Sequence, residues 1–488
     1  MMFTRLSSTL AASALVASLS IASNAFAQTN SFTPTQLLED LQIAKQALEE
    51  AHGGIYRYNS KAYIDRHFDE AKAALNHDID ALGFYRLLKP AVASIACGHT
   101  TALLPLDIKA SLDHELLLPF DVKLLQGRVF IFRDFSEGNR LAGQEIVSIN
   151  GMEIRSIVQT LSKAMHGDGN IPSMRAIEVG RAFKELLFTM LGMRQQFKVV
   201  LRNPKSKSLT QHQIVGQELH SLKQASLKQY PQDQDSTNFL KLSFFDDAKI
   251  AYLKIDNFIV KEENKDGATI LKESFETIRD KNAATLIIDV RDNGGGEDAL
   301  GKLLFSYLID TPFSYYDALT IKTDHYTMDQ YAEEPIRLKA KWLSARSDGQ
   351  FDFLKHPNLG IQQPSLPAFK GRVLILINGG SYSTSSEFLT QVHAHHRATF
   401  IGEESGGAYY GNTSGHHMLL TLPNTKVRLV VPLMTYQLST KQSHAADRGV
   451  MPDYPVQRTI EDYIQGRDPE WRLALKLAHQ SNTKTLKH

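Results

Sequence analysis

The amino-acid sequence predicts a multidomain α/β protein. At 488 residues the chain is too long for one small core, since domains usually hold about 100 to 200 residues. Helical periodicity fills residues 33–104, whereas strand and helix patterns alternate from residue 239 onward. Continuous runs of Leu, Ile and Val between those helices are typical of a parallel sheet that helices cover on both faces.

The first 27 residues have the pattern of a signal peptide. Arg5 precedes an apolar, small-residue stretch over 10–22, and Ala25-Phe26-Ala27 forms an A-x-A cleavage site. The alternative is a membrane anchor, but the stretch is shorter than the roughly 20 apolar residues that span a bilayer. We expect cleavage after Ala27 and a periplasmic or secreted protein. Cys97 is the only cysteine, so no intramolecular disulfide is expected.

Composition sets few further limits on function. Hydrophobic residues make up 42% of the chain and charged residues 22%, as in ordinary soluble domains. The formal net charge of +1 creates no basic field that would attract nucleic acid, so we expect no nucleic-acid partner.

Residues 28–105 are predicted to form a helical N-terminal domain. Over 35–52, leucines recur at three- and four-residue spacings, which marks an amphipathic helix that Thr35 could cap. Two more helical patterns follow, at 63–75 and 80–96.

Residues 110–203 resemble a PDZ-like α+β domain. Two β-rich runs flank Gln126-Gly127, and the phrase G-x-E-I-x-x-I-N-G, which recurs in such domains, ends in the tight-hairpin pair Asn150-Gly151. A long helical insertion over 166–193 departs from this pattern. The resemblance implies a module that binds a C-terminal or extended peptide by adding it as a strand. The polar segment 204–238 that follows is predicted to be a linker.

Strands and helices alternate through the predicted C-terminal core, residues 239–480. The expected strands are 249–258, 283–290, 371–378 and 398–402, and the expected helices are 267–281, 296–309 and 385–396. Parallel α/β sheets place their sites at the carboxyl ends of the strands. Three such loops are rich in polar residues and glycine, namely DVRDNGGGED at 289–298, NGGSYSTSSEF at 378–388 and GEESGGAYYGNTSG at 402–415.

The second of these loops crowds four serines and a threonine ahead of a helix. Thr384 and Glu387 fit a capping box, which leaves Ser383 at the strand-to-helix corner, near the positive end of the helix dipole. A nucleophile needs such an exposed and preorganised corner. The alternative is that every hydroxyl here is a helix cap or a turn residue.

The first loop ends in three consecutive glycines, whose backbone N–H groups could converge as an oxyanion hole requires. A phosphate cradle is the alternative, but the form G-x-x-x-x-G-K-[ST] is missing. A zinc site is a further alternative, because His393 and His396 are three residues apart on a predicted helix. No H-E-x-x-H frame accompanies them.

In chain order, D-x-R-x-N-x-G-G, the serine-rich corner and G-E-x-[ST]-x-G resemble the motifs of the tail-specific proteases, the C-terminal processing peptidases of family S41. The resemblance covers about residues 245–460. Relatives of this family include tricorn protease cores and interphotoreceptor retinoid-binding protein repeats. It implies a ClpP/crotonase-like serine peptidase core that cleaves peptide or unfolded-protein substrates without metal or organic cofactor. A catalytically silent binder of peptides or apolar ligands, and an esterase, stay open as alternatives.

The resemblance also implies roles for individual residues. The nucleophile position falls on Ser383. The lysine base of the classical branch falls on Ala408, so a Ser–Lys dyad is not available, whereas SIACGHTTAL resembles the histidine motif of the tricorn-like branch at His99. The acid that orients this base would be Asp447 or, as a competitor, Glu403.

The implied mechanism is acyl transfer. His99 takes the proton of Ser383, whose Oγ attacks a peptide carbonyl, and water then hydrolyses the acyl-enzyme. The oxyanion would be held by backbone N–H groups of Gly295 or Gly296 and of Thr384.

The leader gives the first testable prediction. Protein recovered from cells that express the full chain should begin at Gln28, because a signal peptidase would cut after Ala27. N-terminal sequencing of the periplasmic fraction measures this. Recovery of intact Met1 on cytoplasmic protein would refute export.

Overall fold

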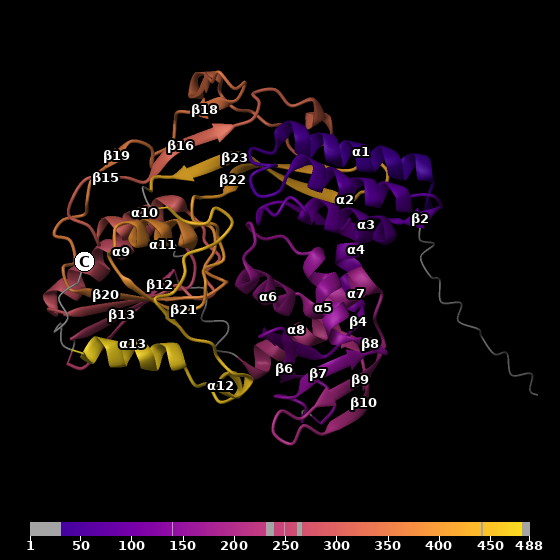
Figure 1. Ribbon diagram of the computed structural model, residues 1–488, viewed down its shortest axis with the longest axis horizontal. Helices are drawn as coiled ribbons and strands as arrows, with labels where there is room; N and C mark the ends of the chain where they lie inside the picture. Colours follow the sequence, from indigo (N-terminus) through magenta and orange to yellow (C-terminus); the bar gives the residue numbers. More distant parts are fainter. Residues whose placement is uncertain are drawn as a thin grey trace, which may run out of the picture.

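The computed structural model describes residues 31–138, 140–230, 239–247, 249–260, 266–440 and 443–480. The predicted signal peptide lies outside the described residues. In Figure 1 the helical N-terminal region lies at upper right, the PDZ-like region below it, and the larger α/β core at left. None of the helices in these ranges is both long and apolar enough to cross a membrane.

The N-terminal region is helical, as predicted. Its helices are α1 (Pro34–Ala51), α2 (Lys61–Ala74) and α3 (Ala81–Ala93). The expected cap at Thr35 is wrong: Thr33 caps α1 in a capping box with Gln36. The helix starts earlier because Pro34 has the fixed φ that suits a first helical position and lacks an N–H that would need a partner there.

These helices do not form a core of their own. Their buried leucines share one apolar cluster with the hairpin of β22 (Thr413–Thr421) and β23 (Arg428–Leu438). Asp40 on α1 accepts hydrogen bonds from the backbone N–H (2.8 Å) and hydroxyl (2.6 Å) of Thr425, in the hairpin turn. The N-terminal region and the core are therefore packed as one body.

The region predicted to be PDZ-like contains a six-stranded sheet with the path β10-β9-β7-β6-β5 and β8 paired to β7. Its elements are β5 (Phe120–Leu125), β6 (Arg128–Asp134), β7 (Glu145–Ile149), β8 (Met152–Glu153), α5 (Ile154–Lys163), β9 (Gln196–Arg202) and β10 (Leu209–Val215). The predicted hairpin turn is confirmed, because Asn150 and Gly151 both have positive φ, at 50° and 80°.

The predicted linker differs from the structure. β10 and α8 (Leu219–Gln229) both lie within 204–238, and the remainder, 231–238, lies outside the described residues. The sequence reads as a linker because β10 is an edge strand with mostly exposed side chains, so it carries no alternation of apolar residues.

The insertion within the PDZ-like region forms α6 (Pro172–Arg181) and α7 (Phe183–Leu191). α6 packs along the edge strand β5, where a Cβ added to Gly180 would lie 3.4 Å from the carbonyl oxygen of Val122. A peptide that added itself at β5 would have to displace α6. The loop ahead of α6 reaches the end of the helical N-terminal region, where Gly169 N–H donates to the carbonyl of Ala96 (2.9 Å).

The core sheet has the order β12-β13-β14-β20-β21-β24. Its strands are β12 (Leu240–Phe245), β13 (Ile250–Ile255), β14 (Thr285–Asp289), β20 (Arg372–Ile377), β21 (Thr399–Gly402) and β24 (Tyr454–Pro455). All neighbours from β13 onward pair in parallel, and only β12 is antiparallel. The predicted parallel sheet is confirmed.

Helices cover both faces of this sheet. On one face lie α9 (Gly267–Asp280), α10 (Asp298–Ser306) and α11 (Thr384–Ala394), and on the other α13 (Pro469–His479) (Figure 1). Alternate residues of the strands point to opposite layers: Ile375 packs in the cluster that includes Phe388 of α11, whereas Leu374 packs against α13.

A second sheet joins the helical region to the core through strand pairing. β3 (Thr101–Leu103) pairs antiparallel with β23, so that Thr101 lies opposite Val430. This pairing fixes the residues just before β3, including His99, at the boundary between the two regions.

Candidate active site

The chain turns sharply between β20 and α11, and Ser383 stands at that corner. Ser383 is the first residue ahead of α11, with φ 55° and ψ −124°. A residue with a side chain is strained in this backbone region, and such strain is concentrated at functional sites. The predicted capping box is wrong: Glu387 is buried and instead accepts hydrogen bonds from Tyr316 (2.6 Å) and Asn412 (2.8 Å).

The other hydroxyls of the serine-rich corner have structural partners. Four of them donate to backbone carbonyls at 2.8 to 2.9 Å: Ser381 to Val290, Thr384 to Gly296, Ser385 to Asn293 and Ser386 to Ser381. Ser383 Oγ differs, because its only partner in the described part of the chain is a side chain, the imidazole of His99. The crowding of hydroxyls thus has a structural cause that leaves Ser383 apart.

His99 connects this corner to a second side chain. Its Nε2 lies 3.2 Å from Ser383 Oγ, and its Nδ1 lies 2.8 Å from the hydroxyl of Tyr382, whose ring stacks on the imidazole. Burial, together with the smaller effects of the nearby His417, His166 and His52, lowers the pKa of His99 to about 3. The imidazole is therefore neutral at pH 7, the form that can accept a proton from serine.

The glycine-rich loop lies against the same corner. A Cβ added to Gly295 would lie 2.7 Å from Ser383 Cβ, so only glycine fits there. Gly295 N–H is already taken by Asn293 Oδ1 (2.9 Å). The N–H groups of Gly296 and Thr384 donate to no acceptor among the described residues. These two remain available to stabilise an oxyanion.

Residues 249–456 match the model of peptidase family S41. The core domain belongs to this family. The match takes in the glycine-rich loop, the serine corner and the loop after β21, so the protein is a serine-type peptidase.

Solved structures with a similar fold include mature CPAF, which is 13% identical with a TM-score of 0.62 over 93% of this chain and 99% of CPAF. Mature CPAF complexed with lactacystin is 13% identical with a TM-score of 0.63 over 91% and 98%. The photosystem II D1 C-terminal processing protease is 14% identical with a TM-score of 0.42 over 87% and 93%. No curated protein matches the chain.

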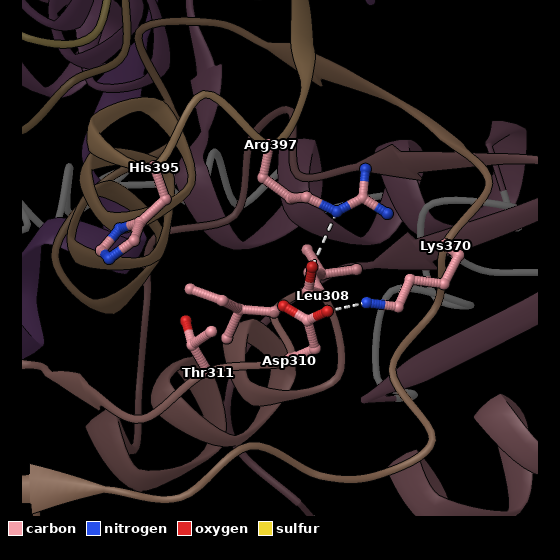
Figure 2. Close-up of a pocket in the computed structure, with 7 residues that line it drawn as sticks. Leu308, Asp310, Thr311, Lys370, His395 and Arg397 are labelled. Carbon is pink, nitrogen blue, oxygen red and sulfur yellow. Dashed lines mark hydrogen bonds and ion pairs between the residues drawn. The ribbon is translucent and has the colours of Figure 1, made fainter.

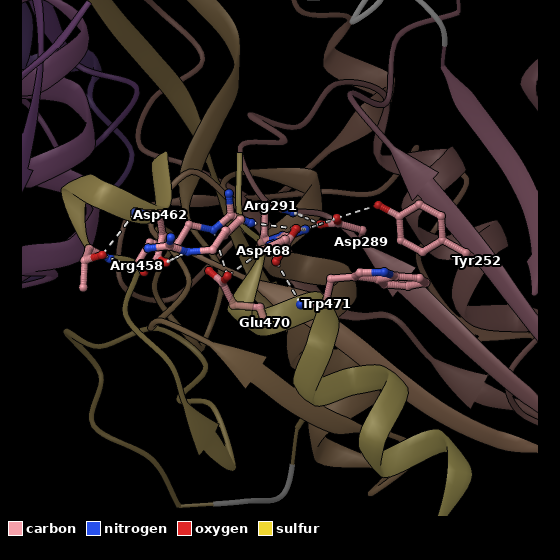
Figure 3. Close-up of polar contacts among 10 residues, drawn as sticks. Tyr252, Asp289, Arg291, Arg458, Asp462, Asp468, Glu470 and Trp471 are labelled. Atoms are coloured by element: carbon pink, nitrogen blue, oxygen red, sulfur yellow. Dashed lines mark hydrogen bonds and ion pairs between the residues drawn. The ribbon is translucent and has the colours of Figure 1, made fainter. Parts of the chain in front are cut away.

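A buried charge network holds the glycine-rich loop of the S41 core in place (Figure 3). Arg291, in the D-x-R motif, binds Asp289 (2.6 Å) on its own strand and Asp468 (2.9 Å) at the start of α13. Arg458 binds Asp468 (2.7 Å) and Glu470 (2.8 Å) from the other side. Because Asp289 is almost fully buried, loss of Arg291 would leave an unpaired buried charge.

The two acids named from sequence, Asp447 and Glu403, do not bond to His99 in the structure. The backbone carbonyl of Asp447 accepts from Asn170 N–H (2.8 Å), but its carboxylate has no hydrogen-bond partner within the described ranges. Glu403 bonds to Gln457, and its pKa is raised by burial and by the neighbouring Glu470. Neither carboxylate forms a described bond to His99.

Sequence reasoning passed over Tyr382 and Asp168. Tyr382 sits inside the quoted serine motif, so its position beside the nucleophile was a usable signal. Asp168 lies in the insertion, with a side chain 1% exposed, and its Oδ1 accepts from Gly98 N–H (2.8 Å). Burial raises the pKa of Asp168 to about 6.

Within the part of the chain that the structure describes, one cluster of side chains could hold a metal ion. Single ligand atoms of Cys97, His99 and Asp168 lie within 4.8 Å of one another. Zinc ligands sit only about 2.0 to 2.3 Å from the ion, and both nitrogens of His99 already have partners. Burial raises the pKa of Cys97 to about 12, so this residue is a thiol, and it donates to the carbonyl of Thr413.

The histidines that suggested zinc lie elsewhere. His393 Nδ1 is 2.9 Å from the hydroxyl of Tyr409. A hollow of about 400 Å³ near the far end of α11 is lined by His395, Arg397, Lys370 and Asp310 (Figure 2). Since Ser383 lies at the N-terminal end of that helix, this hollow is not part of the catalytic site.

The buried amide of Asn293 should be essential for stability. Asn293→Ala removes the bonds from Nδ2 to the carbonyl of Ile255 and from Gly295 N–H to Oδ1, both 2.9 Å. Stranded buried partners cost about 1–3 kcal/mol each, so we expect a loss of roughly 2–5 kcal/mol in unfolding free energy. Urea denaturation measures this.

Asn203→Ala is the matched control. Asn203 also accepts two backbone N–H groups, but in an exposed turn, so the loss should be at most about 1 kcal/mol. Equal losses in both variants would contradict the role given to Asn293.

Proposed function

We propose that this protein is an exported serine peptidase in which Ser383 is the nucleophile and a histidine, His99, replaces the lysine base of the classical S41 branch. The observation that carries the proposal is the 3.2 Å contact between Ser383 Oγ and His99 Nε2, two residues that are 284 positions apart in sequence. A contact of this length suits proton transfer. The lysine position is occupied by Ala408, which is buried.

In the proposed reaction, the O–H proton of Ser383 moves to His99 Nε2 while Oγ forms a bond to the carbonyl carbon of the peptide. The N–H groups of Gly296 and Thr384 stabilise the negative oxygen. His99 then gives its proton to the leaving amine, and the C–N bond breaks. Water hydrolyses the acyl-enzyme, with His99 again as base.

Extracellular or periplasmic location and peptide capture belong to the same proposal. The leader pattern of residues 1–27 supports export. The PDZ-like sheet supports a peptide-binding role, although α6 lies along β5. A silent binding protein and an esterase are the competing functions. The hydroxyl of Ser383 favours an enzyme over the silent binder, because its one partner in the described part of the chain is the imidazole of His99.

Ser383→Ala should abolish turnover without unfolding the protein. The change removes one oxygen from a half-buried corner, so the unfolding free energy should change by less than about 1 kcal/mol. Peptide hydrolysis should fall by at least about 10³-fold. Peptide hydrolysis by His99→Gln should fall by a similar factor. The measurements are kcat on a quenched-fluorescence peptide library, labelling by a fluorophosphonate probe, and thermal melting.

Ser385→Ala is the control, because Ser385 donates a buried hydrogen bond yet lies two residues past the nucleophile. It should lose about 1 kcal/mol of stability and keep probe labelling. Labelling of Ser383→Ala at the wild-type rate would refute the nucleophile. Turnover of p-nitrophenyl esters without any peptide turnover would favour the esterase. Since CPAF is known in complex with lactacystin, this compound is a suitable competitor of the probe.

A further inference from the structure

The catalytic pair needs an anion that the motif residues do not provide. During acyl transfer His99 becomes an imidazolium, and in a buried position this cation is costly unless an opposite charge is near. The low pKa of His99 expresses that cost. The carboxylates of Asp447 and Glu403 form no described bond to His99, so another group must provide the charge.

A donor without an acceptor lies beside His99. If Nε2 accepts the proton of Ser383, then Nδ1 must carry a hydrogen, which it donates to the hydroxyl oxygen of Tyr382 at 2.8 Å. The hydroxyl hydrogen of Tyr382 then needs an acceptor of its own. If it instead points at Nδ1, the imidazole is held in the tautomer that cannot take a proton from serine.

An acceptor without a donor lies in the same place. Asp168 Oδ2 is buried and forms no hydrogen bond of normal geometry among the described residues, although the backbone N–H of Ala408 lies near the carboxylate and lowers its pKa, whereas Oδ1 is bound to Gly98 N–H. A carboxylate oxygen of Asp168 lies within 4.8 Å of a ring nitrogen of His99. Unsatisfied buried carboxylate oxygens are rare and call for an explanation.

Gly98 brings donor and acceptor together. A Cβ added to Gly98 would lie 2.1 Å from the hydroxyl oxygen of Tyr382. This hydroxyl therefore packs against Gly98. The same residue donates its N–H to Asp168. The charge of Asp168 also contributes, after burial, to raising the pKa of Tyr382. Tyr382 and Asp168 are therefore neighbours within one buried cluster.

We propose that Asp168 is the acid that sets the tautomer of His99, acting through the hydroxyl of Tyr382. Asp168 accepts the Tyr382 hydrogen through one water molecule, because no direct hydrogen bond joins these two side chains in the structure. This turns the tyrosine oxygen toward Nδ1–H and leaves Nε2 free for the proton of Ser383. Asp168 stays ionised and Tyr382 stays neutral throughout, so only the serine proton is transferred. The proposal rests on the function proposed above and makes both residues positioning residues.

The PDZ-like insertion would then complete the catalytic site. Asp168 is held there by Gly169 N–H on the carbonyl of Ala96 (2.9 Å) and by Asn170 N–H on the carbonyl of Asp447 (2.8 Å). The titratable and charged groups that act on Asp168 or respond to it are Arg57, Tyr58, Cys97 and Tyr382, with Asp447 acting on Tyr58, and the histidines His417, His166 and His52 act on His99. Within this set Arg57 is the one permanent cation.

Asp168→Asn tests the proposal most directly. Asparagine can keep the bond from Gly98 N–H but presents an NH₂ donor to Tyr382, which reverses the hydroxyl and selects the wrong tautomer. We expect kcat to fall by about 10²- to 10⁴-fold with KM within about threefold. In the wild type, kcat should rise with pH through about 6, as Asp168 loses its proton. In the variant this rise of kcat with pH, the pH limb of the profile, should be absent.

A readout other than activity separates this proposal from failure of the proposed function. ¹⁵N NMR of histidine-labelled protein reports which ring nitrogen carries hydrogen, with the His99 signal identified by its loss in His99→Gln. We expect Nδ1–H in the wild type and Nε2–H in Asp168→Asn. Tyr382→Phe should lose activity as Asp168→Asn does, and the double variant should be no worse than either single one.

Asp40→Asn is the matched control, because Asp40 is another fully buried carboxylate that accepts backbone N–H groups, remote from the site. It should melt lower but keep kcat and the pH limb. If Asp168→Asn fails to fold, Tyr382→Phe decides alone. Wild-type activity in Tyr382→Phe, an unchanged His99 tautomer in Asp168→Asn, or loss of the pH limb in Asp447→Asn but not in Asp168→Asn would each overturn the proposal.

Discussion

The amide of Asn293 joins three parts of the chain that meet at the nucleophile. Nδ2 donates to the end of β13, Oδ1 accepts from the glycine-rich loop, and the backbone carbonyl accepts from Tyr382 N–H (2.9 Å) and from the hydroxyl of Ser385. With its side chain fully buried, each bond is hard to replace with water. The strained backbone of Ser383 can persist because these fixed neighbours surround it.

Electrostatics at the site follow from burial. A neutral His99 and an acid of raised pKa, Asp168, lie in one cluster, and the hydroxyl of Tyr382 contacts His99 there. In such surroundings a proton on His99 is unfavourable at rest and becomes acceptable only when a carboxylate is ionised nearby. The same burial that weakens His99 as an isolated base strengthens its interaction with that carboxylate.

Local patterns in the sequence predicted the parts of the site that depend on local structure. The parallel sheet, the Asn150-Gly151 turn and the corner at Ser383 each follow from residues adjacent in the chain. The capping box failed because Glu387, although correctly spaced, is buried against Tyr316 and turns inward. Local spacing cannot show how a side chain is buried by elements far away in sequence.

The position of Asp168 beside the site could not be predicted for the same reason. Asp168 lies near His99 because the loop ahead of α6 folds back onto the end of the helical region. The linker prediction failed from the opposite cause, since an exposed edge strand such as β10 carries little periodic signal.

The side chains around Ser383 come from three separate stretches: His99 follows the N-terminal helices, Asp168 belongs to the insertion, and Ser383 lies in the core. A ribosome must release almost four-fifths of the polypeptide before His99 and Ser383 can meet. A nascent chain that ends before Ser383 therefore lacks the catalytic pair. The catalytic pair therefore forms only after the N-terminal region and the core have both been made and have folded together.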